Sequence, residues 1–270
     1  MAKKLLVLVF LLLSVLGCKN SALNPDDFSR KAIDKKYPYW QVGISHFEID
    51  NRVGKYTAIT IDEKKYMLVC MALIRVAVNS PEFAEGVKKS KDQLKSSVED
   101  SYGGQNLKYG DQYEPQKLLE CIYSLKYDFA YTKMNTAQGA GPVGKSRYLR
   151  HGLQPENEIP IGKWVGFHSG NWGSLDDVLF GDVEQSQTYA NVAALMFHEH
   201  MHNIGFTHKK DYTVPYVLDK VVRDILNGIL WKDYNLRNKY LKQVNELIAY
   251  YLTEYKYLLT EDTLFDPNKK

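Results

Sequence analysis

Apolar residues recur every three or four positions in several long segments of the chain, which predicts amphipathic helices. The predicted helices cover residues 62–78, a following segment to about 98, 115–131, 188–203, 217–230 and 241–259. The first of these opens with Asp62 and Glu63, acidic residues that favour a helix N-terminus, and Asn79-Ser80-Pro81 ends it. The pattern therefore predicts several helices, with a largely helical tail from Val214 onward.

Shorter segments are rich in β-branched and aromatic residues, which is typical of strands. Tyr39–Ile49 and Tyr56–Ile61 are two such segments, and turn-forming residues lie between them, so they predict a pair of strands joined by a turn. Residues 159–168 and 178–183 predict two further strands. Strands combined with helices in this proportion predict an α+β fold.

Composition and charge narrow the class of protein. The chain has 270 residues, enough for one large domain or two small ones, and its 44% hydrophobic and 25% charged residues are ordinary for a globular protein. A formal net charge of +3 is too small to indicate a nucleic-acid partner, and no basic stripe with interleaved aromatic residues is present. We expect a monomer that does not bind nucleic acid.

The N-terminus has the pattern of an export signal. Two lysines precede an apolar run from Leu5 to Leu16, and Gly17-Cys18 follows. The run is shorter than the roughly 20 apolar residues of a membrane span, but it suits a secretory signal. Its end resembles a bacterial lipoprotein signal, which implies that Cys18 is lipidated and anchors an exported protein to a membrane. An ordinary signal peptide with a chance cysteine is the alternative.

This interpretation divides the chain into three parts. Residues 1–17 form the signal peptide, and residues 18–37, which are polar and lack a sustained apolar face, form a tether. Residues 38–270 form the folded domain. In an exported protein the two remaining cysteines, Cys70 and Cys121, suggest a disulfide, but each lies in an apolar helix-like segment, so two buried thiols fit equally well.

The stretch HEHMHNIGFTH, residues 198–208, holds four of the chain's seven histidines. His198 and His202 are four residues apart in a predicted helix, so both imidazoles can reach one metal ion. Glu199 is rotated by about 100° from His198, which places its carboxylate beside the ion. His200 is rotated by about 200°, so we expect it to face away from the metal as a packed or surface residue.

Gly205 is expected to end this helix, because glycine readily adopts the left-handed conformation of a helix C-terminus. The reversed chain can then bring His208 back as a third ligand. Three nitrogen ligands and an open fourth position describe a catalytic zinc site rather than a closed structural one. Asp211 or Glu246 is an alternative third ligand, although the spacing around Gly205 favours His208.

The stretch matches HExxHxxGxxH, and it resembles the zinc-binding signature of the metzincin metallopeptidases over these eleven residues. The resemblance implies one catalytic Zn²⁺ held by His198, His202 and His208, with Glu199 as general base and acid in peptide-bond hydrolysis. It also implies a twisted mixed sheet with long helices in an N-terminal subdomain, residues 38–205, and a mostly helical C-terminal subdomain, residues 206–270. Residues 159–168 would then be the edge strand that binds an extended peptide.

One feature departs from the metzincin pattern. Metzincins have a methionine in a turn beneath the zinc, but no methionine follows Met201 in this chain. We expect that turn within residues 212–217, where Val214 or Val217 supplies the apolar floor. Tyr216 resembles a tyrosine that approaches the metal in some metzincins, and it is a second candidate catalytic residue; a tyrosine that merely starts the next helix is the alternative.

Two other functions share these residues. One is a surface-binding lipoprotein that keeps a metzincin-like fold without catalysis. The other is a zinc amidohydrolase that acts on a non-protein substrate. Glu199 favours an enzyme over the binding protein, because zinc binding alone does not require that carboxylate. We therefore predict a zinc metallopeptidase with a protein or peptide substrate.

Overall fold

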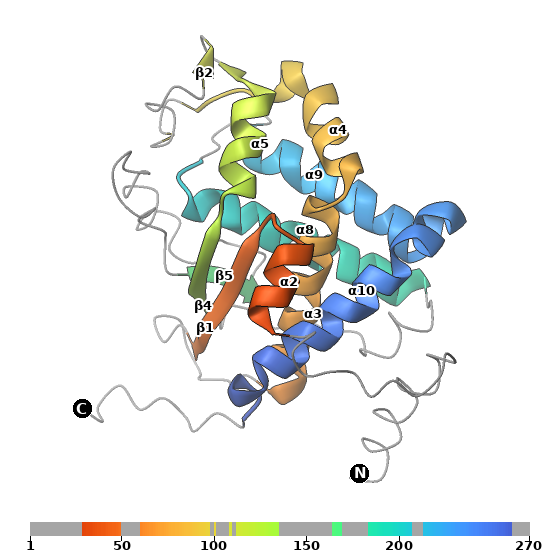
Figure 1. The fold of residues 1–270 in the computed structure, drawn as a ribbon. Coiled ribbons are helices and arrows are strands. Elements are labelled where there is room, and N and C mark those ends of the chain that lie inside the picture. The colour runs from red at the N-terminus through yellow and green to blue at the C-terminus, as the bar shows by residue number, and fades with distance from the viewer. Residues whose placement is uncertain are drawn as a thin grey trace, which may run out of the picture.

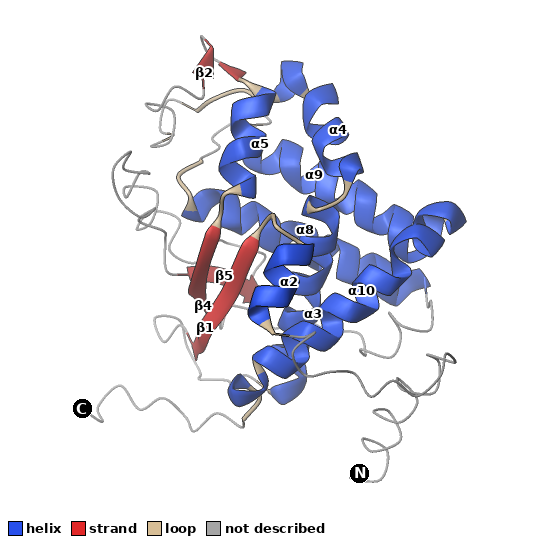
Figure 2. Ribbon diagram, in the orientation of Figure 1, coloured by secondary structure: helices blue, strands red, loops and turns tan. Residues whose placement is uncertain are grey.

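The computed structural model describes residues 29–49, 60–97, 100, 108–109, 112–134, 164–168, 183–206 and 213–260. In this part of the chain, helices predominate and a small sheet lies on one side of them (Figure 1). Figure 2 shows the same division by secondary structure. Strands and helices are both present, as predicted, and most of the described residues are helical.

The main sheet contains three parallel strands in the order β1-β4-β5. Their bounds are Gln41–Ile49 for β1, Lys126–Met134 for β4 and Trp164–His168 for β5. A separate antiparallel pair joins β2, Lys108–Tyr109, to β3, Gln112–Tyr113. A mixed main sheet is thus not confirmed within the described residues, since all three of its strands run in one direction.

Seven α-helices are described. Their bounds are Arg30–Lys36 (α2), Ile61–Val78 (α3), Pro81–Lys89 (α4), Pro115–Tyr123 (α5), Val183–Asn203 (α8), Val214–Asn227 (α9) and Tyr234–Glu254 (α10). A π-helix, Gly228–Lys232, joins α9 to α10, and short 3-10 helices cover Lys91–Gln93 and Lys256–Leu258.

Helix α3 is the centre of the core. It begins with a capping box, in which Thr60 Oγ1 accepts a hydrogen bond from the Glu63 amide at 3.1 Å and Glu63 Oε2 accepts one from the Thr60 amide at 2.8 Å. It packs against α8, α9, α10 and β1, and nearly all of its side chains are buried. A helix that is mostly apolar around its circumference is stable only when protein surrounds it, as protein surrounds α3.

No single helix among the described residues has the length and apolar composition of a membrane span. Helices α3 and α4 pass such a test only when taken together, and they are bent by 71° at their junction.

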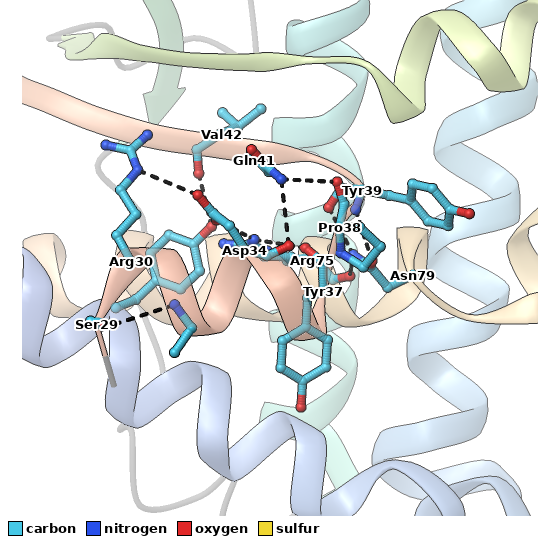
Figure 3. A network of polar contacts seen from close by, with 12 residues as sticks. Ser29, Arg30, Asp34, Tyr37, Pro38, Tyr39, Gln41, Val42, Arg75 and Asn79 are labelled. Carbon is cyan, nitrogen blue, oxygen red and sulfur yellow. Dashed lines mark hydrogen bonds and ion pairs between the residues drawn. The ribbon is translucent and has the colours of Figure 1, made fainter. Parts of the chain in front are cut away.

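The predicted tether is too long at its C-terminal end, because α2 belongs to the folded domain. Ile33 is buried, and Arg75 of α3 donates hydrogen bonds to Asp34 Oδ1 at 2.6 Å and to the Tyr37 carbonyl at 2.8 Å (Figure 3). Tyr37 in turn donates to Glu246 of α10 at 2.8 Å. The sequence pattern missed this helix because α2 buries only one apolar residue, Ile33, and is otherwise held by ion pairs rather than by an apolar face.

The predicted helix over residues 115–131 is wrong beyond α5. Helix α5 ends at Tyr123, with Ser124 as its C-cap, and residues 126–134 form β4 instead. In the described sheet β1 pairs in parallel with β4, and Ile61, predicted as the end of the second strand of a pair, is instead the first residue of α3. Residues 50–59 lie outside the described part of the chain. The helix expected to about residue 98 ends at Lys89.

Two boundaries near the metal motif also differ from expectation. Val183, predicted as the end of a strand, is the first residue of α8, which thus begins five residues before the predicted Thr188. The predicted strand over residues 159–168 is confirmed for Trp164–His168, and its other residues lie outside the described ranges.

The possible disulfide between Cys70 and Cys121 is not formed. Both residues are buried thiols on different helices, Cys70 in the middle of α3 and Cys121 in the last turn of α5. Burial raises the pKa of the Cys70 thiol well above its usual value, which keeps it protonated. Cys70 is therefore a small apolar core residue.

One continuous core runs through the described domain. Its buried side chains come from segments as far apart as Ile33 in α2 and Tyr255 after α10, and they include residues on both sides of Gly205. Helix α9 packs along α8, so the chain before and after Gly205 shares this core (Figure 1). Separate cores do not mark the expected subdomain division in this part of the chain.

Candidate metal centre

Helix α8 brings His198 and His202 together, as their spacing predicts. Their Nε2 atoms lie 3.1 Å apart, and both side chains are buried. The helix reaches this position because its alanines and aromatic residues pack into the core on the side of α3 and α9. Two imidazole nitrogens at this distance, in a site with little water, form a natural pair of metal ligands.

A hydrogen bond fixes which nitrogen of His202 faces the site. Its Nδ1 lies 2.7 Å from the carbonyl oxygen of Phe206. A carbonyl only accepts hydrogen bonds, so Nδ1 carries the proton and Nε2 presents its lone pair toward His198. This arrangement is the usual one for a metal-binding histidine, whose other nitrogen donates to a carbonyl or carboxylate.

Gly205 makes that hydrogen bond available. It has a φ of 103°, as predicted for the helix end, and the turn is a Schellman motif. The Phe206 amide donates to the Met201 carbonyl at 3.0 Å, and the Gly205 amide donates to the His202 carbonyl at 3.0 Å. The reversal directs the Phe206 carbonyl back toward the His202 ring.

Glu199 lies beside the two histidines. Ligand atoms of His198, Glu199 and His202 are all within 4.8 Å of one another, and Glu199 is buried. A carboxylate at this distance can either bind an ion held by the histidines or accept a proton from a water next to it. Its rotation of about 100° from His198 along the helix favours the second role.

The described donors fit a zinc ion. Two nitrogens bound tetrahedrally to one zinc at about 2.0–2.1 Å would lie roughly 3.3–3.4 Å apart, close to the 3.1 Å between the two Nε2 atoms. Imidazole is a preferred ligand for zinc.

His200 faces away from the other histidines, as predicted, and it is fully buried. Its ring packs edge-on to Trp40 at 4.9 Å, and its Nδ1 lies 3.2 Å from the Tyr127 hydroxyl. Burial lowers the pKa of His200 well below its usual value, so the ring is neutral at pH 7. His200 is thus a packing residue on the back of the metal helix.

Asp219 of α9 was not identified from the sequence. Its Oδ2 lies 3.8 Å from His198 Nδ1, and its Oδ1 accepts a hydrogen bond from Arg223, one turn further along α9. Burial raises the pKa of Asp219, and Arg223 opposes that shift. The acid–base spacing of Asp219 and Arg223 is visible in the sequence, but its proximity to His198 depends on how α9 packs along α8.

Tyr216 lies beside the site. Its ring centroid is 4.9 Å from that of His198, and 40% of the residue is exposed. The prediction of a turn over residues 212–217 is wrong from Val214 onward, because these residues form the first turn of α9. Val214 and Val217 are buried as expected, but they lie in a helix. Tyr216 therefore both starts the next helix and approaches His198.

His208, the predicted third ligand, lies outside the described residues, as do the alternative Asp211 and the predicted lipidation site Cys18. The alternative ligand Glu246 is described, and its carboxylate is bound elsewhere. Both of its oxygens lie 2.5 Å from Lys36 Nζ, and Oε2 also accepts from the Tyr37 hydroxyl. These contacts, which hold α2 to α10, argue against Glu246 as a ligand.

Comparison with known proteins found no relative of this chain. No protein-family model, curated protein or solved structure matches the chain. The case for a function therefore depends on the residues of this site and on the motif to which they belong.

Proposed function

We propose that the protein is a zinc-dependent metallopeptidase with a metzincin-like catalytic domain. The observation that carries the proposal is the pair of Nε2 atoms of His198 and His202 at 3.1 Å, with the Glu199 carboxylate among them in a buried site. The same stretch continues to Gly205 and His208 at the spacing of a three-histidine zinc site.

The proposed reaction is hydrolysis of a peptide bond. Zinc, when bound, supplies Lewis acidity, which lowers the pKa of a coordinated water to about 7 and polarises a substrate carbonyl. Glu199 accepts the proton of the attacking water and passes it to the leaving amine. Its low exposure favours both transfers, since little bulk water competes for the carboxylate.

Two other elements have proposed roles around the reacting atoms. Tyr216, half exposed beside His198, can donate its hydroxyl proton as a hydrogen bond to the oxygen of the tetrahedral intermediate. Strand β5 is the outer strand of the described sheet and lies against α8, so its outer edge can pair with an extended peptide.

Metal analysis of the full-length chain tests the ligands. We expect about one zinc per chain in the parent and in Glu199→Gln, and weakened binding in His198→Ala, His202→Ala and His208→Ala. His46→Ala is the matched control, because this histidine is exposed on β1. Asp211→Ala separates the two remaining candidates for the third ligand. A folded parent chain that binds no zinc under zinc-replete conditions contradicts the proposal.

Turnover of a peptide library tests the reaction itself. Glu199→Gln should lose roughly 10²–10⁴-fold in rate while it keeps its metal, since it removes only the proton carrier. Zinc binding without peptide hydrolysis would favour the non-catalytic lipoprotein or the amidohydrolase. Hydrolysis of a non-protein amide, lost in the same variant, would identify the amidohydrolase.

We also propose that the protein is an exported bacterial lipoprotein anchored through Cys18. The support is the position of Cys18 directly after the apolar run in residues 5–16. Mass spectrometry of the mature N-terminus should find a lipid-modified Cys18, and Cys18→Ser should move the protein from the detergent phase to the aqueous phase. An unmodified N-terminus elsewhere would indicate an ordinary signal peptide.

A further inference from the structure

A second carboxylate, that of Asp219, lies next to the proposed metal site, on the Nδ1 side of His198. Asp219 is buried, with 8% of its side chain exposed, and its Oδ2 lies 3.8 Å from His198 Nδ1. Nδ1 is the ring nitrogen opposite Nε2, which faces His202. The distance is longer than a hydrogen bond of about 2.7–3.2 Å, so the contact shown is electrostatic.

Arg223 fixes the orientation of this carboxylate. It binds Asp219 Oδ1 from one turn further along α9, and this leaves Oδ2 on the side of His198. The Arg223 side chain is 40% exposed, so its charge remains hydrated while it neutralises the buried acid. Burying a carboxylate costs free energy unless it is paired, and this pairing offsets the cost.

The two histidines differ in the group that lies next to Nδ1, the ring nitrogen that does not face the other histidine. His202 Nδ1 donates to a backbone carbonyl, that of Phe206, at 2.7 Å. His198 Nδ1 faces the Asp219 carboxylate instead. Metal-binding histidines usually donate their second N–H to such a group, which fixes the tautomer and makes the coordinating nitrogen more basic.

We infer that Asp219 is a positioning residue for the metal, holding the His198 ring with Nε2 toward the ion and supplying the negative charge behind it. This inference rests on the proposed metal site, but not on the reaction performed there. Asp219 does not contact substrate, and its effect passes through His198. Arg223 supports it by holding the carboxylate in place.

Zinc affinity of the full-length chain, measured by competition with a chelator, tests this role. Asp219→Asn should weaken Zn²⁺ binding by roughly 10–100-fold, the usual effect of removing such a partner. Asp224→Asn is the matched control, because it removes the same charge from an exposed position on the same helix and should change the affinity less than about 2-fold. Asp219→Glu, which keeps the charge, should recover part of the loss.

A double-mutant cycle with His198→Ala distinguishes positioning from a general structural effect. In the His198→Ala background, Asp219→Asn should cause no further loss of zinc affinity, because the residue through which it acts is gone. An equal loss in both backgrounds, or parent-like affinity in Asp219→Asn, overturns the inference. Failure of the parent to bind zinc overturns the metal site itself, which is a different result.

Arg223→Gln keeps the inference testable if Asp219→Asn does not fold, as judged by circular dichroism and the thermal midpoint. It leaves the carboxylate in place but removes the group that orients it. We expect a few-fold loss of zinc affinity that is again absent in the His198→Ala background. Unchanged affinity in Arg223→Gln, when Asp219→Asn is unfolded, counts against a positioning role.

Discussion

At the scale of single residues, two unusual backbone conformations contact α8 near His198, His200 and His202. Gly205 has a φ of 103° and directs the Phe206 carbonyl to His202. Trp40 has a φ of 58°, which is unusual for a bulky side chain, and its ring packs against Phe197 and His200 of α8. The strained backbone of Trp40 persists because its buried ring is held by these contacts with α8.

Gly205→Ala tests the first of these conformations. A Cβ disfavours the left-handed region by about 1–2 kcal/mol, so the free energy of unfolding should fall by that amount in a urea titration. Gly205→Asn is the control, since asparagine tolerates positive φ better and should cost less than alanine. An alanine variant as stable as the parent would show that the turn can relax without the glycine.

The parts of the candidate site that lie on one helix could be predicted from the sequence, because helix geometry fixes their directions. The angular positions of His198, His200 and His202 follow from 3.6 residues per turn, and Gly205 ends the helix as glycine commonly does. Asp219 could not be predicted in this way. Its distance from His198 depends on the packing of α9 along α8, which local spacing does not encode.

At the scale of helices and strands, the boundaries of the sheet were the hardest to predict. Leu118, Leu119, Ile122 and Leu125 continue a helical spacing past the true end of α5. The following Tyr127, Phe129 and Tyr131 alternate with polar or small residues, a strand signal that the helical pattern concealed. The parallel pairing of β1 with β4 joins segments about 85 residues apart, so local sequence could not indicate it.

An ion pair between α4 and α10 predicts a pH-dependent contribution to stability. Lys239 donates to Glu82 Oε1 at 2.7 Å, and the Tyr240 hydroxyl donates to the other oxygen. Burial alone would raise the pKa of Glu82, but these hydrogen bonds hold it below its usual value. A lowered pKa in the folded state means that the contribution is complete at neutral pH and is lost as the pH falls through that pKa.

Glu82→Gln should therefore lower the free energy of unfolding at pH 7 by a few tenths to about 1 kcal/mol. The difference from the parent should shrink as the pH falls through the lowered pKa of Glu82, because the carboxyl then becomes protonated in the folded state as well. Glu85→Gln is the control, because Glu85 lies on the same helix in an exposed pair with Lys89 and should show almost no difference. A Glu82 variant whose deficit is constant from pH 7 to pH 3 would refute the electrostatic explanation.

At the scale of the whole molecule, α2 connects the start of the described chain to its centre and its end. Asp34 pairs with the buried Arg75 of α3 (Figure 3). Lys36 pairs with Glu246 of α10. Arg30 also pairs with Asp128 of β4 at 2.9 Å. These long-range pairs make α2 part of the cooperative unit, although its own sequence is polar.

Asp34→Ala should be strongly destabilising, because it leaves the guanidinium of Arg75, 2% exposed, without its anionic partner. The expected loss is about 3–5 kcal/mol, measured by chemical denaturation. Asp62→Ala is the control, since Asp62 is 93% exposed in its pair with Lys65 and should cost less than about 1 kcal/mol. Equal losses in the two variants would contradict a structural role for α2.

The packing of α2 would also limit the distance between the described domain and a lipid at Cys18. If Cys18 is lipidated as proposed, Ser29, the first residue described, follows eleven residues later, and no chain of that length spans more than roughly 40 Å. That span is about the diameter of a domain of this size, so the domain would stay within about one domain diameter of the lipid surface. Substrates would then be selected by their presence within that distance as well as by sequence, and those on the same membrane would meet the enzyme by diffusion in two dimensions.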